Sequence, residues 1–452
     1  MTLLNELSAE VCQRARMSRD PRFDGRFFVA VKTTGIFCRP ICPANLPKEE
    51  NVEYFSSQAL AVSAGYRPCL RCRPESAPHS WAWKGAETTF LRALTLIEQG
   101  ELDGSLETLA SRLGISDRYL RQLFQRHLGM PPKQYAQIQQ LMFAKQLLHT
   151  SQISITEVAY ASGFQSTRRF NDAFQKLFRL TPTQVRRERA ALPSRNHLSL
   201  AFRGPFYWAH MLDFYRLRAI EGMELVDEQS YQRHFVLGEG TGWFKASMAQ
   251  SHLDIEFEME RLSDLRHLVA RLRRMFDLDA DLISIEAHLE QLAPGLVRRT
   301  GIRIPGVWNA WEAGVRAVLG QQVSVKAAIG QLNLLVSTLA ASEGSTRYFP
   351  TPEQVQMSDL SFLRMPERRK ETLKRLADYV RLHPMDSPMA WLSLSGIGPW
   401  TIDYAQLRGE SRSHCFLTGD LIVKKALAKF PQLTAESVAP WGSYATFHCW
   451  SH

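Results

Sequence analysis

Four cysteines in the N-terminal part of the sequence have the type and spacing best suited to chemistry. They form two pairs, Cys38 with Cys42 and Cys69 with Cys72. Thiolates are strong ligands for zinc, and a short spacer lets both sulfurs of a pair reach the same ion. The sequence therefore predicts one Zn²⁺ held by these four cysteines.

The sequence around the cysteines is basic, with Lys32, Arg39, Arg67, Arg71 and Arg73 close to them. Four thiolates outweigh the charge of one Zn²⁺, so the cluster itself is anionic. A zinc cluster that only stabilises a fold has no need of so many cations, and their presence favours a polyanionic partner. From the residues alone, a plain structural zinc site remains the alternative.

Read together with segments 30–40 and 64–72, residues 1–75 resemble the methyl-acceptor domain of Ada-type proteins. The resemblance implies that a zinc-bound thiolate removes a methyl group from a methylphosphotriester in the DNA backbone, once per molecule. The family pattern assigns this role to the first cysteine, Cys38. Zinc keeps thiols deprotonated at neutral pH, and methylation of one sulfur makes the cluster less negative. Methyl uptake would therefore strengthen DNA binding, so that repair acts as a switch.

A second candidate for chemistry is Asp420, which follows a glycine-rich turn containing Gly396 and Gly398. Two glycines around one apolar residue, between amphipathic segments, predict a helix-hairpin-helix. Its turn exposes backbone N–H groups that can bind a phosphate without regard to sequence. Taken alone, the hairpin predicts DNA-backbone binding, and Asp420 is expected to cap the helix that begins at Leu421.

The hairpin and the aspartate, together with segments 202–208, 275–278, 316–324 and 441–445, resemble the AlkA-like members of the helix-hairpin-helix DNA glycosylases. The resemblance implies that Asp420 stabilises an oxocarbenium-like transition state and orients water beside a base flipped out of the duplex. Gln322 matches the residue that fills the gap left by the base. Aromatic residues are expected to stack on cationic bases, namely Phe214, Trp400, Tyr404 and Trp450.

Two departures from the family pattern bear on the reaction. Leu421 stands where an aromatic residue follows the aspartate, so the base preference can differ. Trp400 stands where strand-nicking relatives carry a lysine. The resemblance therefore implies a monofunctional enzyme that releases alkylated purines such as 3-methyladenine by water attack. Simple core packing is the alternative role for Trp400 and Trp450.

An internal repeat lies between these two candidates. Segments 106–124 and 155–174 each place an apolar helix, a small alanine, a glycine turn and a second, basic helix in the same order. This order is typical of a helix-turn-helix, and the pair resembles the DNA-binding domain of AraC-type regulators. Segment 105–189 contains 13 Lys plus Arg and 5 Asp plus Glu, which supports DNA binding. The expected DNA contacts are Arg118, Arg121, Arg126, Arg168, Arg169 and Lys176; a helical bundle with solvated basic faces is the alternative.

The whole sequence of 452 residues has 45% hydrophobic residues, an ordinary globular balance, and its net charge of +10 favours a polyanionic partner, either nucleic acid or an acidic membrane face. It contains no apolar run long enough to span a membrane and no signal-peptide pattern at Met1. Seven cysteines, four of them in a metal site, favour a reducing cytoplasm. Binding to DNA would place the protein at the nucleoid.

The sequence thus predicts a multidomain α+β protein with four domains. These are a zinc-binding α/β module (1–75), an all-α tandem helix-turn-helix domain (85–190), a small antiparallel-sheet α+β domain (196–300) and an all-α helix-hairpin-helix domain (301–452). A linker is expected at 74–80 and a boundary at 192–196. The expected partners are alkylated double-stranded DNA, promoter DNA and, for an activator, RNA polymerase. Two rival interpretations are a transcription regulator with a non-catalytic C-terminal half and a repair enzyme whose N-terminal half only anchors it to DNA.

Overall fold

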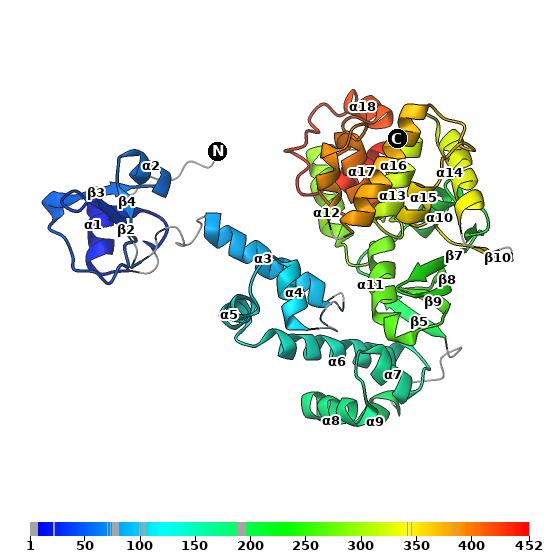
Figure 1. Cartoon of the computed structure of the whole chain (residues 1–452), viewed down its shortest axis with the longest axis horizontal. Coiled ribbons are helices and arrows are strands. Elements are labelled where there is room, and N and C mark those ends of the chain that lie inside the picture. The colour runs from blue at the N-terminus through cyan, green and yellow to red at the C-terminus, as the bar shows by residue number, and fades with distance from the viewer. Residues whose placement is uncertain are drawn as a thin grey trace. The chain divides into compact units, whose positions relative to one another are not determined.

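The computed structural model describes residues 8–20, 23–69, 71–72, 74, 81–98, 100, 102, 105–187, 196–340, 342–344, 346–384 and 386–451. Arg73, most of the expected linker and nearly all of the expected boundary lie outside these residues. The chain folds into two compact units, 1–139 and 140–452. Their elements are labelled in Figure 1. Within the described residues, every helix is too short or too polar to cross a bilayer.

The N-terminal module is a small mixed sheet between two short helices. Its strands lie in the order β3-β1-β2-β4, in which β2 and β4 are parallel and the other neighbours antiparallel. Cys12 and Ala15 pack with Phe27 and Val29, and Ala61 packs with Phe37 in a second cluster. The elements are α1 (Ala9–Met17), β1 (Phe28–Val31), β2 (Ile36–Cys38), η2 (Glu49–Asn51), β3 (Val52–Phe55), α2 (Gln58–Ser63) and β4 (Arg67–Pro68).

The predicted repeat is present as two helix pairs of equal length. Helices α4 (Leu106–Arg112) and α5 (Asp117–Leu128) correspond to α7 (Ile155–Ala161) and α8 (Thr167–Phe178). Serine side chains cap all four helices, since their oxygens accept backbone N–H bonds of the first turn. The glycine in each turn has a positive φ, and the alanine before it is buried. The accompanying helices are α3 (Trp81–Glu98), α6 (Pro132–Thr150) and α9 (Pro182–Arg187).

A five-stranded antiparallel sheet begins the region after residue 195. Its strand order is β5-β9-β8-β7-β6, and the predicted strands at 197–202, 231–237 and 253–257 are three of its members. Phe235, Phe244 and Phe257 share a core with Leu272 and Trp308. The elements are β5 (His197–Ala201), α10 (Trp208–Arg216), β6 (Glu224–Val226), β7 (Ser230–Leu237), β8 (Gly240–Met248) and β9 (His252–Met259).

From Leu262 onward the chain is almost entirely helical, as predicted. Helix α13 is buried along nearly its whole length, and Figure 1 shows it among α14, α16 and α17. The elements are η4 (Leu262–Asp264), α11 (Leu265–Met275), α12 (Leu282–Leu292), α13 (Ala310–Gly320), α14 (Val325–Leu339), β10 (Ser342–Glu343), β11 (Thr346–Arg347), α15 (Pro352–Met357), α16 (Glu367–Leu382), η5 (Pro388–Ser393), α17 (Pro399–Gly409), α18 (Leu421–Leu427) and α19 (Gly442–Trp450). The predicted multidomain α+β fold is confirmed.

Candidate functional site

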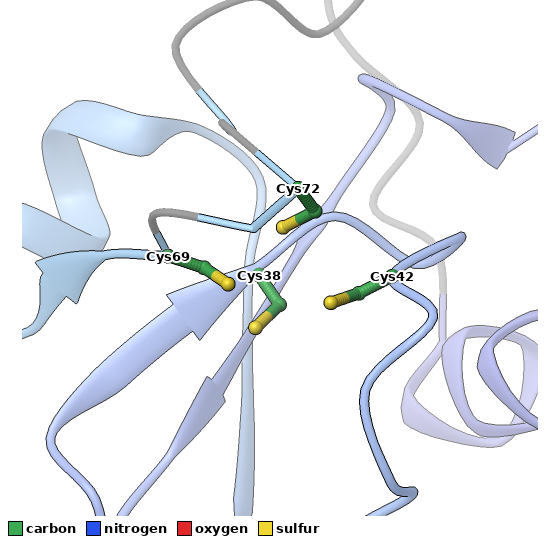
Figure 2. Close-up of side chains that lie close together, drawn as sticks. All are labelled: Cys38, Cys42, Cys69 and Cys72. Atoms are coloured by element: carbon green, nitrogen blue, oxygen red, sulfur yellow. The ribbon is translucent and has the colours of Figure 1, made fainter.

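The four cysteine sulfurs of the N-terminal module converge on one point. Cys38 ends β2 and Cys69 directly follows β4, and the parallel pairing of these strands brings the two residues to the same end of the sheet. Cys42 and Cys72 reach this point from loops (Figure 2). The four Sγ atoms lie within 4.8 Å of one another, as a tetrahedral site with Zn–S bonds of about 2.3 Å requires.

Arg39 supports the cysteine cluster from inside the module. Its Nε donates to Oδ1 of Asp24 at 2.8 Å, its Nη2 pairs with Oδ2, and its Nη1 donates to the carbonyl of Cys72 at 3.3 Å. The backbone N–H of Arg39 donates to Sγ of Cys72 at 3.3 Å. The side chain of Arg39 is thus committed to the fold, whereas those of Lys32, Arg67 and Arg71 are exposed. These three are the described cations of the predicted polyanion surface. Lys32 lies 3.8 Å from Glu53 at the surface, in an exposed pair that a polyanion can replace.

The cysteine thiols interact strongly with one another. The pKa of Cys72 is lowered to about 5, mainly because its sulfur accepts a hydrogen bond from the Cys38 thiol. Burial opposes this shift, and the backbone N–H of Arg39 adds to it. The same hydrogen bond between Cys38 and Cys72, together with burial, raises the pKa of Cys38. Burial raises the pKa of Cys42 as well, so metal binding to this cluster must release thiol protons.

The six predicted DNA contacts lie on the second helix of each repeat unit and are all exposed. Arg118, Arg121 and Arg126 lie on α5, and the corresponding residues of α8 are Arg168, Arg169 and Lys176. Arg121 differs from the others because its Nη2 pairs with Oδ2 of Asp117 at 3.0 Å. Both helices therefore present positive charge on the face expected to enter a groove of DNA.

The helix-hairpin-helix turn runs from Leu394 to Gly398, between the 3-10 helix η5 and α17. Gly396 has φ +93°, and a Cβ atom there would lie 2.1 Å from Oγ1 of Thr372. Gly398 has φ −112° and begins α17, and a Cβ atom there would meet nothing within 4 Å. Gly396 is thus required, because a side chain there would need an unfavourable positive φ and would collide with Thr372. Gly398 has no such restriction, and the space beside its Cα atom is unoccupied by protein.

A cavity of about 410 Å³ lies beside the hairpin helix α17, a size typical of small-molecule sites. Its wall brings together Asp420 and all four predicted aromatic residues, Phe214, Trp400, Tyr404 and Trp450, and we call it the aromatic cavity. Trp400 stacks on Tyr404 with ring centroids 5.3 Å apart, and Phe214 lies parallel to Trp450 at 6.2 Å. The cavity is therefore built from residues far apart in the sequence.

Asp420 both caps a helix and faces the aromatic cavity. Its Oδ1 accepts hydrogen bonds from the backbone N–H groups of Ile422 at 2.9 Å and Val423 at 3.2 Å, so the predicted N-cap is present. The same oxygen accepts the indole N–H of Trp450 at 3.1 Å. These three donors fix the plane of the carboxylate, and none of them engages Oδ2.

Gln322 lies in the turn between α13 and α14 at the edge of the aromatic cavity. Its neighbours Gly320 and Val323 line the cavity, but Gln322 is exposed, with φ +57°. The preceding Gln321 donates from Nε2 to the carbonyl of Gly396 at 3.1 Å and to Oγ1 of Thr401 at 3.2 Å. The turn that carries Gln322 is thereby tied to the hairpin.

Sequence reasoning missed the arginines of the aromatic cavity. Arg218 and Arg316 line it, and the guanidinium of Arg408 lies 4.6 Å from the ring centroid of Phe214. Arg408 donates to Oη of Tyr404 at 3.0 Å. Although burial opposes it, the positive charges of Arg408, Arg218 and Arg316 lower the pKa of Tyr404. The position of Arg218 four residues after Phe214, one helical turn on, was the available signal.

A buried ion network fastens the sheet to the helical region next to this cavity. Arg233 of β7 donates to Glu224 at 2.8 Å and to Glu312 of α13, and Arg316 lies 3.2 Å from Glu224 and 2.8 Å from Glu312. Burial alone would raise the pKa of Glu312, but the two arginines outweigh it and lower that pKa to about 2. Each of the four groups is thus paired with a group of opposite charge type, as buried charges must be.

Three protein-family models match separate segments of the chain. Residues 11–75 match the metal binding domain of Ada, residues 109–188 a helix-turn-helix domain and residues 197–309 the AlkA N-terminal domain. The probable bifunctional transcriptional activator/DNA repair enzyme AlkA of Mycobacterium tuberculosis is 34% identical, over 98% of this chain and 96% of its own length. The chain belongs to this AlkA family of bifunctional proteins.

Other relatives of this AlkA family member match one part of the chain each. DNA-3-methyladenine glycosylase 2 of Escherichia coli is 33% identical over 56% of this chain and 96% of its own length. The bifunctional transcriptional activator/DNA repair enzyme Ada of E. coli is 35% identical over 38% of this chain and 47% of its own length. Among solved structures, a methylated N-Ada/DNA complex matches 29% of this chain and 98% of its own, with 36% identity and a TM-score of 0.26.

These matches confirm the resemblance to Ada-type and AlkA-like proteins that the sequence predicted. They also decide the nature of the cysteine site in this AlkA family member. The four cysteines belong to the matched metal binding domain and form a compact cluster, and they bind one Zn²⁺.

Proposed function

We propose that this AlkA family member senses methylated DNA, activates transcription and removes damaged bases. The observation that carries the enzymatic part is the convergence of Asp420 with Trp400, Tyr404 and Trp450 on one cavity beside a phosphate-binding hairpin. The proposal divides the work among four domains, 1–75, 85–190, 196–300 and 301–452. The basic helices α5 and α8 support promoter binding by the second domain, which recruits RNA polymerase in this proposal.

Base excision uses Asp420 as the catalytic carboxylate. The duplex is held at Gly396 and Gly398, Gln322 fills the gap in the stack, and the damaged base enters the aromatic cavity. As the N-glycosidic bond breaks, its electrons leave with the base, and the Oδ2 atom of Asp420 stabilises the positive sugar. Water adds to the sugar and loses a proton, which leaves an abasic site.

The proposed reaction is monofunctional, with alkylated purines such as 3-methyladenine as substrates. Strand nicking requires an amine that attacks the sugar, and among the described residues no lysine lines the aromatic cavity. Trp400 occupies the hairpin position of the lysine in strand-nicking relatives. Alkylated purines leave readily because the base already carries positive charge, so the carboxylate suffices.

The excision proposal is tested by base release from dimethyl-sulfate-treated DNA. The intact protein should release 3-methyladenine, and Asp420→Asn should reduce the rate by at least about 100-fold, as expected when a group that acts in the transition state is removed. Borohydride should trap no covalent complex between protein and DNA. Absence of release from folded, zinc-loaded protein would leave a DNA-binding regulator as the function.

Methyl transfer is proposed for Cys38, which lies at the end of β2 and belongs to the zinc cluster. The Cys38 sulfur attacks the methyl carbon, the bond between that carbon and the phosphate oxygen breaks, and a phosphodiester anion leaves. Bound zinc supplies a stable thiolate at neutral pH. Exposed Lys32, Arg67 and Arg71 support the DNA backbone as the substrate.

Radiolabelled methyl transfer tests the role of Cys38. The intact protein should accept one methyl group per molecule from methylated DNA, and Cys38→Ala should accept none. Cys12→Ala is the matched control, because Cys12 is a buried thiol of the same module outside the zinc cluster. Stoichiometric uptake by the Cys38 variant would assign the reaction to another cysteine.

A further inference from the structure

Arg218 presents unused hydrogen-bond donors to the aromatic cavity. Its guanidinium carbon lies 3.7 Å from the ring centroid of Phe214, and its Nη1 donates to the Phe214 carbonyl at 3.3 Å. This is the one hydrogen bond described for a guanidinium that has five N–H donors. Because Arg218 lines the cavity together with Asp420, the remaining donors are available to a molecule that enters.

Arg218 also differs from neighbouring arginines in its lack of a carboxylate partner. Arg316 pairs with Glu224 and Glu312, whereas the described ion pairs include none to Arg218. Burial lowers the pKa of Arg218 to about 10. Tyr404 opposes this shift, and the positive charges of Arg408 and Arg316 add to it. The side chain therefore remains cationic at neutral pH and adds an uncompensated positive charge to the cavity wall.

The stacking of Arg218 changes what Phe214 can do. The sequence predicts that this ring stacks on a cationic base, but Arg218 lies over it and Arg408 lies 4.6 Å from its centroid. Only 9% of Phe214 is exposed. The Phe214 ring thus already makes cation–π contacts with two arginines of the protein. A cationic base that approached this ring would meet the positive guanidinium of Arg218.

We infer that Arg218 is a specificity-determining residue of the excision reaction. It favours a neutral base whose edge carries a carbonyl oxygen or ring nitrogen, because its free N–H groups can donate to that atom. Its charge slows, but does not prevent, excision of a positively charged alkylated purine, which remains a substrate because its glycosidic bond breaks readily. The inference rests on the proposed glycosylase function and assigns to Arg218 the discrimination between neutral and cationic bases.

Single-turnover excision of two bases tests this inference. One DNA carries hypoxanthine, a neutral purine with a carbonyl oxygen, and the other carries 3-methyladenine, which is cationic in DNA. Arg218→Met removes both charge and donors. The hypoxanthine rate should fall by about 10-fold or more, because loss of a hydrogen-bonding group strongly affects discrimination, while the 3-methyladenine rate stays equal or rises. Arg218→Lys keeps the positive charge and should keep the wild-type 3-methyladenine rate, while its hypoxanthine rate should fall no further than that of Arg218→Met.

Two controls separate specificity from stability. Arg216→Met changes an exposed arginine at the end of α10, two residues before Arg218, that pairs with Asp213, and it should leave both rates unchanged. Melting temperatures of all variants report on the fold. If Arg218→Met left the ratio of the hypoxanthine rate to the 3-methyladenine rate unchanged, including by an equal fall in both, the inference would be overturned and the glycosylase proposal would stand. Absence of any release by the intact protein would overturn the glycosylase proposal, and the inference with it.

Discussion

The indole Nε1 of Trp450 donates a 3.1 Å hydrogen bond to the Oδ1 atom of Asp420, the same oxygen that caps helix α18. Three N–H groups thus hold one carboxylate oxygen, and the other oxygen keeps its lone pairs for a substrate. A residue at the end of α19 thereby orients a residue at the start of α18. The contact leaves Oδ2 of a helix-capping residue free for the catalytic role proposed for Asp420.

Replacement of Trp450 by phenylalanine should slow base release without unfolding the protein. The variant keeps an aromatic ring but loses a hydrogen bond to a carboxylate, worth about 1.5–3 kcal/mol. We expect a 10- to 100-fold lower single-turnover rate, if that energy acts in the transition state. Trp441→Phe is the matched control, since Trp441 begins the same helix and does not line the aromatic cavity. Equal rates for the two variants would contradict the orienting role.

The two hairpin glycines should respond differently to alanine. Gly396→Ala places a methyl group 2.1 Å from Thr372 Oγ1 at a φ of +93°, so the turn must distort. Its affinity for undamaged duplex DNA, measured by fluorescence anisotropy at fixed salt, should fall at least about 10-fold, because the phosphate-binding N–H groups move. Gly398→Ala meets no atom within 4 Å and should bind within about 3-fold of the intact protein. A Gly398 variant as weak as the Gly396 variant would refute this distinction.

Arg118 should contribute more to DNA binding than Arg121, although both lie exposed on α5. Arg121 pairs with Asp117 at 3.0 Å and must weaken that contact to reach a phosphate, whereas the described ion pairs include none to Arg118. Arg118→Ala should therefore reduce affinity for duplex DNA several-fold more than Arg121→Ala. The salt dependence of binding should also become shallower for Arg118→Ala. The reverse order of affinities would show that the ion pair on α5 is irrelevant to DNA binding.

Zinc removal should separate the two proposed reactions. A chelator that strips the cysteine cluster should abolish methyl uptake, because the thiols regain protons and the module loses its ligand-dependent stability. Base release should persist within about 2-fold, since Asp420 and the aromatic cavity belong to the compact unit 140–452. Readdition of Zn²⁺ should restore uptake. Loss of both activities on chelation would indicate that the cysteine module supports the excision reaction.

Asp277 should make the protein less stable as pH rises from about 4 to about 7. Burial raises its pKa to about 7, against opposing contacts from the Ile304 N–H, Arg303 and Tyr444. The unfolded chain releases this proton near pH 4, so the folded state binds more protons in this window and stability falls with rising pH. Above pH 7 the loss of unfolding free energy caused by ionised, buried Asp277 no longer changes with pH, and it amounts to at most about 4 kcal/mol.

Urea unfolding between pH 4 and 8, followed by tryptophan fluorescence, measures this effect. Asp277→Asn carries no titrating group there and should show a smaller fall in unfolding free energy over the window. Asp279→Asn is the control, because Asp279 is exposed and pairs with Arg273. If the unfolding free energy of Asp277→Asn fell with pH as steeply as that of the intact protein, groups other than Asp277 would be responsible for the pH dependence.

Local patterns were sufficient to predict the repeat and the zinc ligands. These features depend on residues a few positions apart, so their spacing is visible in the sequence. They are the serine caps of the helices, the alanine of each repeat unit (Ala110 and Ala159) and the paired cysteines. Strand β8 was not among the predicted strands, and Gly240 and Gly242 weaken its strand pattern. The second glycine is needed for a tertiary reason, since a Cβ atom there would lie 2.4 Å from the carbonyl of Glu258.

The charges of the aromatic cavity could not be predicted in the same way. Resemblance supplied Asp420 and the aromatic residues, and the pairing of Arg316 with Glu312 follows an i,i+4 spacing on α13, but the second partner of Arg316, Glu224 of β6, is 92 residues away in the sequence. The lack of such a partner for Arg218 is equally a property of the folded chain. Pairing between distant charges has no periodic signature that a sequence pattern can reveal.

The chain order of the two sites has a consequence for synthesis on the ribosome. All four zinc ligands have been made once Cys72 is added, whereas the aromatic cavity lacks a wall until Trp450 follows. N-terminal domains fold first during translation. A growing chain can therefore acquire its metal and its methyl-accepting thiolate long before it can excise a base, so truncated products of this gene would detect damage without cutting bases from the genome.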